Sequence, residues 1–166
     1  MLLDQALFTE LLATAAQQPR RRTFLNLHQN FAEPVQRVVI AMHADSYVPP
    51  HRHTEPQQWE LFVMLAGAVD FLQFDDAGTV TARRQLSAGS ALTGLELAPG
   101  QWHTVVARAP GAVFLEVKQG PFDPAQPRHF APFAPTEQDA QASFFQQWLC
   151  AATVGDVSPT WQEIAG

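Results

Sequence analysis

The sequence predicts an all-β protein, an antiparallel β-barrel of the jelly-roll type with a short helix at each end. From about residue 35 to residue 120, short runs rich in Val, Leu, Phe and Thr alternate with turn residues. The gaps between these runs leave no room for the crossover helices that parallel strands need. The 166 residues include 13 prolines, which suits many turns better than a helical bundle.

An N-terminal helix is expected within residues 1–22. Leu3, Leu7 and Leu11 recur at helical spacing, and Asp4 is placed to cap the first turn. Pro19 ends the segment, because proline cannot continue the hydrogen bonding of a helix.

The barrel is expected to span residues 23–120. Its strands are separated by Pro-, Gly- and Asp-containing turns, and this close spacing is typical of an antiparallel barrel or sandwich. Seven strands are predicted, at residues 36–42, 59–65, 68–74, 79–86, 91–97, 102–107 and 112–118.

Residues 121–166 are expected to form a Pro-rich tail against the barrel, followed by a C-terminal helix. Thr136-Glu137-Gln138-Asp139 resembles a capping box, which predicts the start of that helix. Its apolar stripe should pack on the barrel, and Cys150 is expected to be buried. This apolar stripe of the C-terminal helix consists of Phe144, Phe145, Trp148 and Leu149. Together, residues 1–166 are expected to form one domain.

Charge and cysteine content exclude several classes of function. The net charge is -6, and the only basic cluster is residues 20–22, so neither nucleic acid nor a membrane is expected as a partner. The single cysteine excludes an intramolecular disulfide and a cysteine-rich zinc site. With no apolar run long enough to span a membrane and no export signal, a cytoplasmic location is expected.

Three histidines and one glutamate form a candidate metal site. His51 and His53 are two residues apart, so in an extended strand their side chains project from one face. Glu60 begins a predicted apolar strand, and His103 follows the turn at Pro99-Gly100. An antiparallel barrel can bring these distant positions together.

This pattern resembles the two motifs of the cupin superfamily. The first motif corresponds to His51-Arg52-His53, Glu60 and, after six intervening residues, Gly67. The second corresponds to Pro99-Gly100 and His103, although Ala107 stands where the motif ends in Asn. The resemblance implies a cupin barrel whose metal ligands are the three histidines and Glu60.

Further segments resemble the WbuC-type cupin metalloproteins, a branch associated with bacterial surface-polysaccharide gene clusters. The resemblance covers roughly residues 23–137 and defines no reaction. Its most specific segments are Ser46-Tyr47-Val48-Pro49-Pro50-His51-Arg52-His53, Trp102-His103-Thr104-Val105 and Leu115-Glu116-Val117-Lys118-Gln119-Gly120-Pro121-Phe122.

Three imidazoles and a carboxylate make a mixed nitrogen and oxygen site. We expect one divalent metal ion per chain, with Fe, Mn, Ni and Zn all compatible with these ligands. An octahedral ion would keep two positions open for water or substrate.

Three further residues are candidates for catalysis. Glu116 and Lys118 alternate with aliphatic residues, so they either face the barrel lumen or form an ion pair in solvent. Arg37 lies in a predicted strand and either meets a polar ligand or stays on the surface.

Two main functions remain open. The chain is either a metal-dependent enzyme acting on a small oxygen-rich molecule, such as a sugar or sugar nucleotide, or a metal-containing module that binds such a ligand without turnover. A metal-free, epimerase-like cupin is a weaker alternative. A homodimer is also expected, because cupins often pair through strands and an open sheet edge favours pairing.

Overall fold

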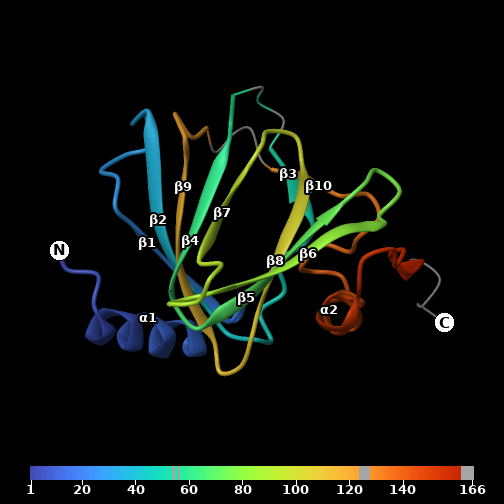
Figure 1. The fold of residues 1–166 in the computed structure, drawn as a ribbon, viewed down its shortest axis with the longest axis horizontal. Coiled ribbons are helices and arrows are strands. Elements are labelled where there is room, and N and C mark those ends of the chain that lie inside the picture. The colour runs from blue at the N-terminus through green and yellow to red at the C-terminus, as the bar shows by residue number, and fades with distance from the viewer. Residues whose placement is uncertain (54, 56, 124–127, 162–166) are drawn as a thin grey trace.

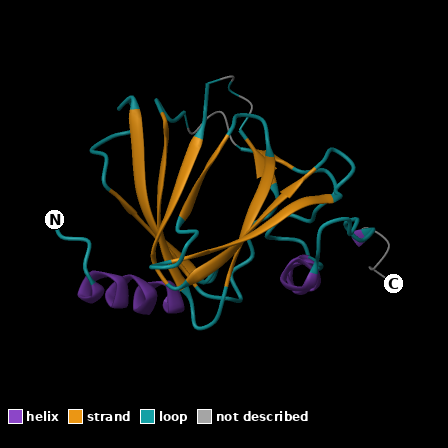
Figure 2. Cartoon of the chain, in the orientation of Figure 1, coloured by secondary structure: helices purple, strands orange, loops and turns teal. Residues whose placement is uncertain are grey.

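Two five-stranded antiparallel sheets face one another in the computed structural model, with one helix at each end of the chain (Figures 1 and 2). The structure describes all residues except 54, 56, 124–127 and 162–166. Sheet A has the strand order β1-β2-β9-β4-β7, and sheet B has the order β10-β3-β8-β5-β6. The predicted all-β fold with terminal helices is therefore confirmed.

Sheet A contains β1 (Arg22–Asn26), β2 (Val35–Met42), β9 (Ala112–Gln119), β4 (Glu60–Ala66) and β7 (Gly94–Leu97). Sheet B contains β10 (His129–Phe130), β3 (His51–Arg52), β8 (Trp102–Ala107), β5 (Ala68–Phe74) and β6 (Val80–Ser87). All seven predicted strands are present, although β7 begins three residues later than expected. β1, β3 and β10 were not among the predicted strands.

The main core lies between the two sheets. It is lined by alternate residues of the facing strands, which is why one side chain in two is large and apolar. Phe71 and Phe114 are almost fully buried there, and Phe62 packs on both. This core fills the closed part of the barrel and leaves the polar residues near its other end.

Helix α1 (Gln5–Gln17) covers the outer face of sheet A. Phe8 and Leu11 pack there against Val39, Ala41 and Val113. The helix begins as predicted, since the Asp4 carboxylate accepts a hydrogen bond from the Leu7 N–H at 3.0 Å.

Helix α2 (Ala142–Ala151) packs on the outer face of sheet B, but it begins later than predicted. The Thr136 N–H and hydroxyl both donate to the Asp139 carboxylate, at 2.7 and 2.8 Å. These bonds close a local turn instead of capping the helix, whose N-cap is Gln141.

Two further expectations about α2 were wrong. Phe145 and Leu149 are buried in the predicted stripe, whereas Phe144 is 43% exposed. Cys150 is also exposed, because it lies on the side of α2 that faces away from the buried pair. Neither described helix is long and apolar enough to cross a membrane.

Candidate metal centre

The two sheets bring the four predicted ligands to one place. β3 pairs with β8, which sets His51 opposite His103, and His53 follows two residues after His51. Atoms of these three buried histidines that can bind a metal all lie within 4.8 Å of one another. No other group of three or more such residues occurs in the described part of the chain. Three buried histidines from sheet B could therefore bind one metal ion.

Glu60 reaches the same cluster from the opposite sheet. It is the first residue of β4 in sheet A and is 2% exposed. Its Oε1 lies 3.0 Å from Nε2 of His53, and its Oε2 lies 3.1 Å from Nε2 of His103. The structure thus groups the three histidines and sets the Glu60 carboxylate against two of them, His53 and His103.

Backbone carbonyls orient two of the imidazoles. Nδ1 of His51 lies 2.9 Å from the carbonyl of Pro49, and Nδ1 of His103 lies 2.9 Å from the carbonyl of Gln101. A carbonyl only accepts hydrogen bonds, so each Nδ1 carries the proton and donates it. In the neutral rings Nε2 then holds a free lone pair, which is the arrangement that metal-binding histidines use.

Aromatic packing holds the ring of His103 in this orientation. Phe71 stacks on it with a centroid distance of 5.6 Å and an interplanar angle of 7°. Phe62 meets the same ring edge-on at 6.2 Å. With His103 only 2% exposed, little rotation of the imidazole is possible without repacking the core.

Lone pairs face one another between these residues. If His103 is neutral, its Nε2 lone pair points toward Glu60 Oε2, which has no hydrogen-bond partner. Nε2 of His53 is likewise buried without a partner of hydrogen-bonding geometry. Such groups are costly to bury unless a positive charge lies among them. A divalent cation would satisfy all of these lone pairs at once, whereas one added proton would satisfy only one pair.

The protonation states suit a cation. Burial, together with His103 and Arg128 nearby, holds the pKa of His51 well below its usual range. Burial alone would raise the pKa of Glu60, but when His103 and His53 carry an Nε2 proton, their hydrogen bonds and charge outweigh burial and hold that pKa well below its usual range. With neutral imidazoles, a bound cation would supply that positive charge instead. A neutral imidazole and an ionised carboxylate are the forms that bind metals.

Of the three catalytic candidates, two lie inside the barrel. Glu116 and Lys118 are each 6% exposed, and Lys118 Nζ lies 2.9 Å from Glu116 Oε1. They form a buried ion pair rather than a solvent-exposed one. Lys118 is paired in register with Glu60, which places the ion pair beside the candidate metal ligands.

Arg37 is not brought to the site. It pairs in register with Val117, while the neighbouring pair Val38 and Glu116 faces the interior, so Arg37 projects from the outer face of sheet A. There its guanidinium lies 3.0 Å from a carboxylate oxygen of Glu33.

Sequence reasoning missed Arg128, which precedes β10. β10 runs antiparallel to β3 with His129 opposite Arg52 and Phe130 opposite His51, and Arg128 directly precedes this pairing. Its side chain lines the narrow cavity beside His51 and His103 and also a wider cleft beside His53. No motif marks this position, which lies in the Pro-rich tail.

The two cavities that border the histidines differ in size and in the residues that line them. The narrow cavity beside the histidines has a volume of about 30 Å³, enough for a few solvent-sized atoms, and apolar residues form most of its wall. The cleft beside His53 is larger, at about 490 Å³.

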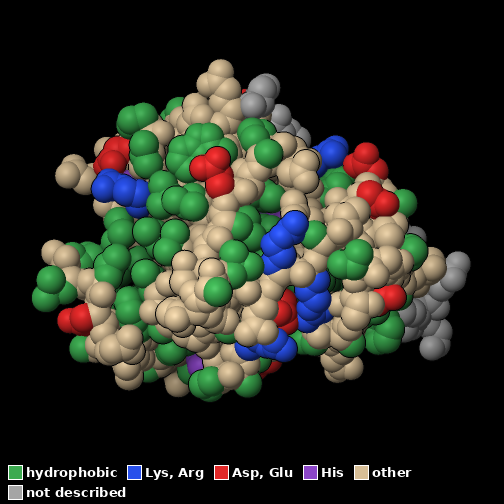
Figure 3. Space-filling view, in the orientation of Figure 1, with side chains coloured by type: hydrophobic (Ala, Val, Ile, Leu, Met, Phe, Trp, Pro, Cys, Tyr) green, Lys and Arg blue, Asp and Glu red, His purple; other side chains and the backbone are tan. Residues whose placement is uncertain are grey.

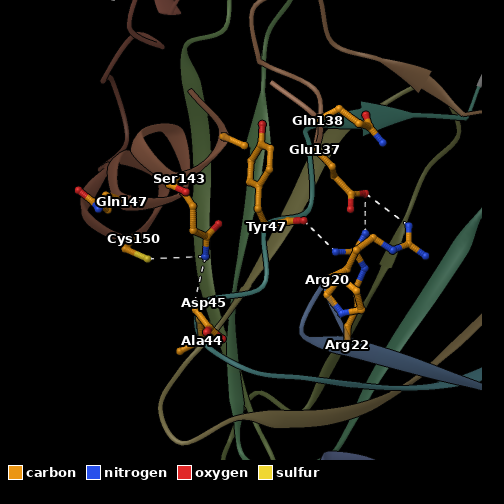
Figure 4. A pocket seen from close by; sticks show the side chains of 13 residues that line it. Arg20, Arg22, Ala44, Asp45, Tyr47, Glu137, Gln138, Ser143, Gln147 and Cys150 are labelled. Atoms are coloured by element: carbon orange, nitrogen blue, oxygen red, sulfur yellow. Dashed lines mark hydrogen bonds and ion pairs between the residues drawn. The ribbon is translucent and has the colours of Figure 1, made fainter. Parts of the chain in front are cut away.

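A still larger cavity, of about 670 Å³, lies between residues 19–22, the loop at 44–47 and α2, away from the histidines. Figure 4 shows Arg22 within it, bonded to Glu137 and to the backbone carbonyl of Tyr47. None of the described residues lining it is a histidine. Its Arg20 and Arg22 pair with Glu137, and its Asp45 pairs with Arg21.

Comparison with solved structures gives the same type of fold. KdgF from Halomonas sp. superposes with a TM-score of 0.50 at 15% identity, over 66% of this chain and 89% of that one. Recombinant oxalate oxidase in complex with glycolate gives 0.53 at 20% identity, over 78% and 66%. CapF with the inhibitor 3-isopropenyl-tropolone gives 0.55 at 18% identity, over 68% of this chain but only 32% of CapF.

With the two antiparallel sheets, these likenesses show the cupin, or double-stranded β-helix, type of fold. At such low identity they show the fold alone. No curated protein matches the sequence. One family model does match, over residues 3–86, and these residues include α1, the HxH pair and Glu60. The chain therefore belongs to the family described as Domain of unknown function (DUF6016).

Proposed function

We propose that His51, His53, Glu60 and His103 bind one divalent metal ion, and that the protein is a metal-dependent enzyme acting on a small oxygen-rich molecule. The observation that carries the metal site is the set of buried, mutually facing lone pairs on Glu60, His53 and His103. A bound divalent ion supplies Lewis acidity to a ligand that reaches it.

The surrounding residues support a small ligand. The cleft beside His53 gives access from the surface, and its wall carries the amides of Gln57, Gln58 and Gln119, which can donate to and accept from hydroxyl groups. Two proteins of similar fold were solved with small oxygen-bearing molecules, glycolate and a tropolone.

We propose, on the resemblance to WbuC-type cupins, that this molecule is a sugar or sugar nucleotide of bacterial surface-polysaccharide metabolism. The buried Glu116–Lys118 pair, which lies beside Glu60, would hydrogen-bond polar groups of the ligand. The alternative is a module that binds the same ligand without turnover.

One experiment separates these functions. Protein purified without a histidine tag is analysed for metal and then incubated with a panel of sugar nucleotides, and products are followed by mass spectrometry. An enzyme converts a member of the panel and loses this activity in chelator. A binding module raises its own melting temperature with the ligand but forms no product. Absence of bound metal would contradict both.

We also propose that two copies of the chain form a homodimer. β1 is an edge strand of sheet A, and its Phe24 is 43% exposed. On the face seen in Figure 3, hydrophobic side chains gather over the part of sheet A where β1 and β2 lie. Light scattering at tens of micromolar protein should give twice the mass of one chain, and the mass of a single chain would contradict the dimer.

A further inference from the structure

We infer that the ligand of this site carries a carboxylate group, which Arg128 binds from one side while the ion binds it from the other. This inference rests on the proposed metal centre and specifies the chemistry of its ligand. Arg128 is a positioning and specificity residue here, because it holds the ligand rather than taking part in a reaction.

The first argument is the place of Arg128. It is half-buried, and its side chain borders both the narrow cavity at His51 and His103 and the wider cleft at His53. Arg128 is the residue that the linings of the two cavities share, so it is placed to contact a ligand that lies in the cleft and reaches toward the histidines. Within the described part of the chain, Arg128 has no ion pair or hydrogen bond, so its five N–H donors are free to bind such a ligand.

The second argument is the balance of charge. Arg22, the other cation of the narrow cavity, is paired with Glu137 at 2.6 Å. Glu116, the only acid among the described residues that line that cavity, is paired with Lys118 at 2.9 Å. Glu60 neutralises one charge of a divalent ion. One positive charge on the metal centre and one on Arg128 then remain.

These two positive charges lie beside an apolar wall, where electrostatic interactions are stronger than in water. The two acids of the cleft, Glu55 and Asp123, are exposed at its rim, where solvent screens them. The inner end of the cleft therefore favours an anion over a neutral polyol.

The third argument is geometric. A guanidinium matches the two oxygens of a carboxylate, and such charge-assisted pairs are among the stronger hydrogen bonds in proteins. The narrow cavity has a volume of about 30 Å³, so it admits only a small chemical group. A carboxylate fits these limits, and it is then the end of the ligand that enters the barrel, whether the rest is a sugar or a simpler chain.

The test compares two small probes that differ at one carbon. Lactate and propane-1,2-diol share a three-carbon skeleton and a hydroxyl, but only lactate carries a carboxylate. Binding to the full chain loaded with Co(II) is followed by the visible spectrum of the ion and by calorimetry. Lactate should bind at least about tenfold more tightly than the diol, which is the scale of one hydrogen bond to a charged group.

Arg128→Gln should weaken lactate binding by about tenfold or more and leave diol binding unchanged. It should also keep one Co(II) per chain. Arg84→Gln removes the same charge from an exposed residue of β6 and should behave as the wild type. Arg128→Lys should restore only part of the lactate affinity, because an ammonium does not form the two-oxygen pair.

The outcomes separate the two proposals. Full Co(II) occupancy with equal lactate affinity in wild type and Arg128→Gln overturns this inference and leaves the metal centre intact. Lactate binding that is unchanged by removal of Co(II) overturns it as well, because the ion then takes no part. A wild-type chain that binds no Co(II) overturns the metal centre itself, and this inference with it.

Discussion

His51 and Glu60 show how the surroundings of single residues prepare a site for a cation. Both are buried, and both are held by their neighbours in the protonation state that binds metal. Because these protonation states differ from those of the unfolded chain at some pH values, the free energy of unfolding of the metal-free protein should depend on pH.

The lowered pKa of His51 predicts a loss of stability in acid. In the unfolded chain this imidazole takes up a proton near pH 6.5, but in the folded chain it does so only well below that. The unfolded state therefore binds more protons below pH 6.5, and the free energy of unfolding falls as pH drops. Metal-free protein in chelator should lose up to about 1.4 kcal/mol per pH unit through this residue.

Denaturant unfolding between pH 7.5 and pH 5 measures this dependence. His51→Asn should give a flatter slope below pH 6.5, whatever its stability at neutral pH. His129→Asn, which changes an exposed histidine on β10, should keep the wild-type slope. Equal slopes for His51→Asn and wild type would show that the buried imidazole does not titrate as described.

Among the elements, one ion pair joins the N-terminal strand to the segment before α2. The Arg22 side chain is 5% exposed and lies 2.6 Å from Glu137, while it also donates to the carbonyl of Tyr47 at 2.9 Å. Burial lowers the pKa of Arg22, and Glu137 opposes that effect. The pair therefore fixes β1 against residues far along the chain.

Glu137→Ala should lower the free energy of unfolding by about 2–3 kcal/mol, because it leaves the Arg22 charge buried without its partner. This lies just below the range of about 3–5 kcal/mol for breaking a fully buried pair, since the Glu137 side chain is 19% exposed. Arg20→Ala is the control. Arg20 lies 3.6 Å from the same carboxylate but is 59% exposed, so its removal should cost less than about 1 kcal/mol. Equal losses in the two variants would contradict the role of burial.

The strands that sequence reasoning predicted are those whose signals are local. β4, β5, β8 and β9 each combine apolar residues with a turn at either end, and their observed bounds lie within one residue of the predicted ones. β3 and β10 have two residues each, too few for a repeating pattern. The start of α2 was missed because Thr136 and Asp139 bond to one another in a turn that resembles a helix cap.

The candidate site was predictable to a similar extent. The spacing of His51, His53 and Glu60 and the turn before His103 identified residues that the fold brings together. The place of Arg128 beside the histidines could not be predicted, because it follows from a short pairing between β10 and β3 that no local pattern encodes. For Arg37 the sequence left both faces of the strand open, since which face of β2 is interior is decided by packing under α1.

At the scale of the whole molecule, the candidate centre joins the two sheets. The histidines belong to sheet B and Glu60 belongs to sheet A, so an ion held by all four would cross-link the two halves of the barrel. Metal that binds only the folded state should therefore stabilise the entire fold, by about 2.7 kcal/mol when free metal is 100 times its dissociation constant.

His103→Ala removes one of the proposed ligands and should abolish this stabilisation. In the presence of metal the variant should melt well below the wild type. In excess chelator the difference should shrink to the cost of lost packing against Phe71 and Phe62, because neither protein then holds an ion. His129→Ala, with an exposed histidine, should behave as the wild type in both conditions. A melting difference that is equally large with and without chelator would assign His103 a purely structural role.

The most direct test of the metal centre is elemental analysis of the tag-free wild type and the His103→Ala variant, both dialysed against the same trace of divalent metal. The four-ligand site predicts about one ion per wild-type chain and a large loss of that ion in the variant. Full occupancy in His103→Ala, or no ion in the wild type, would contradict it.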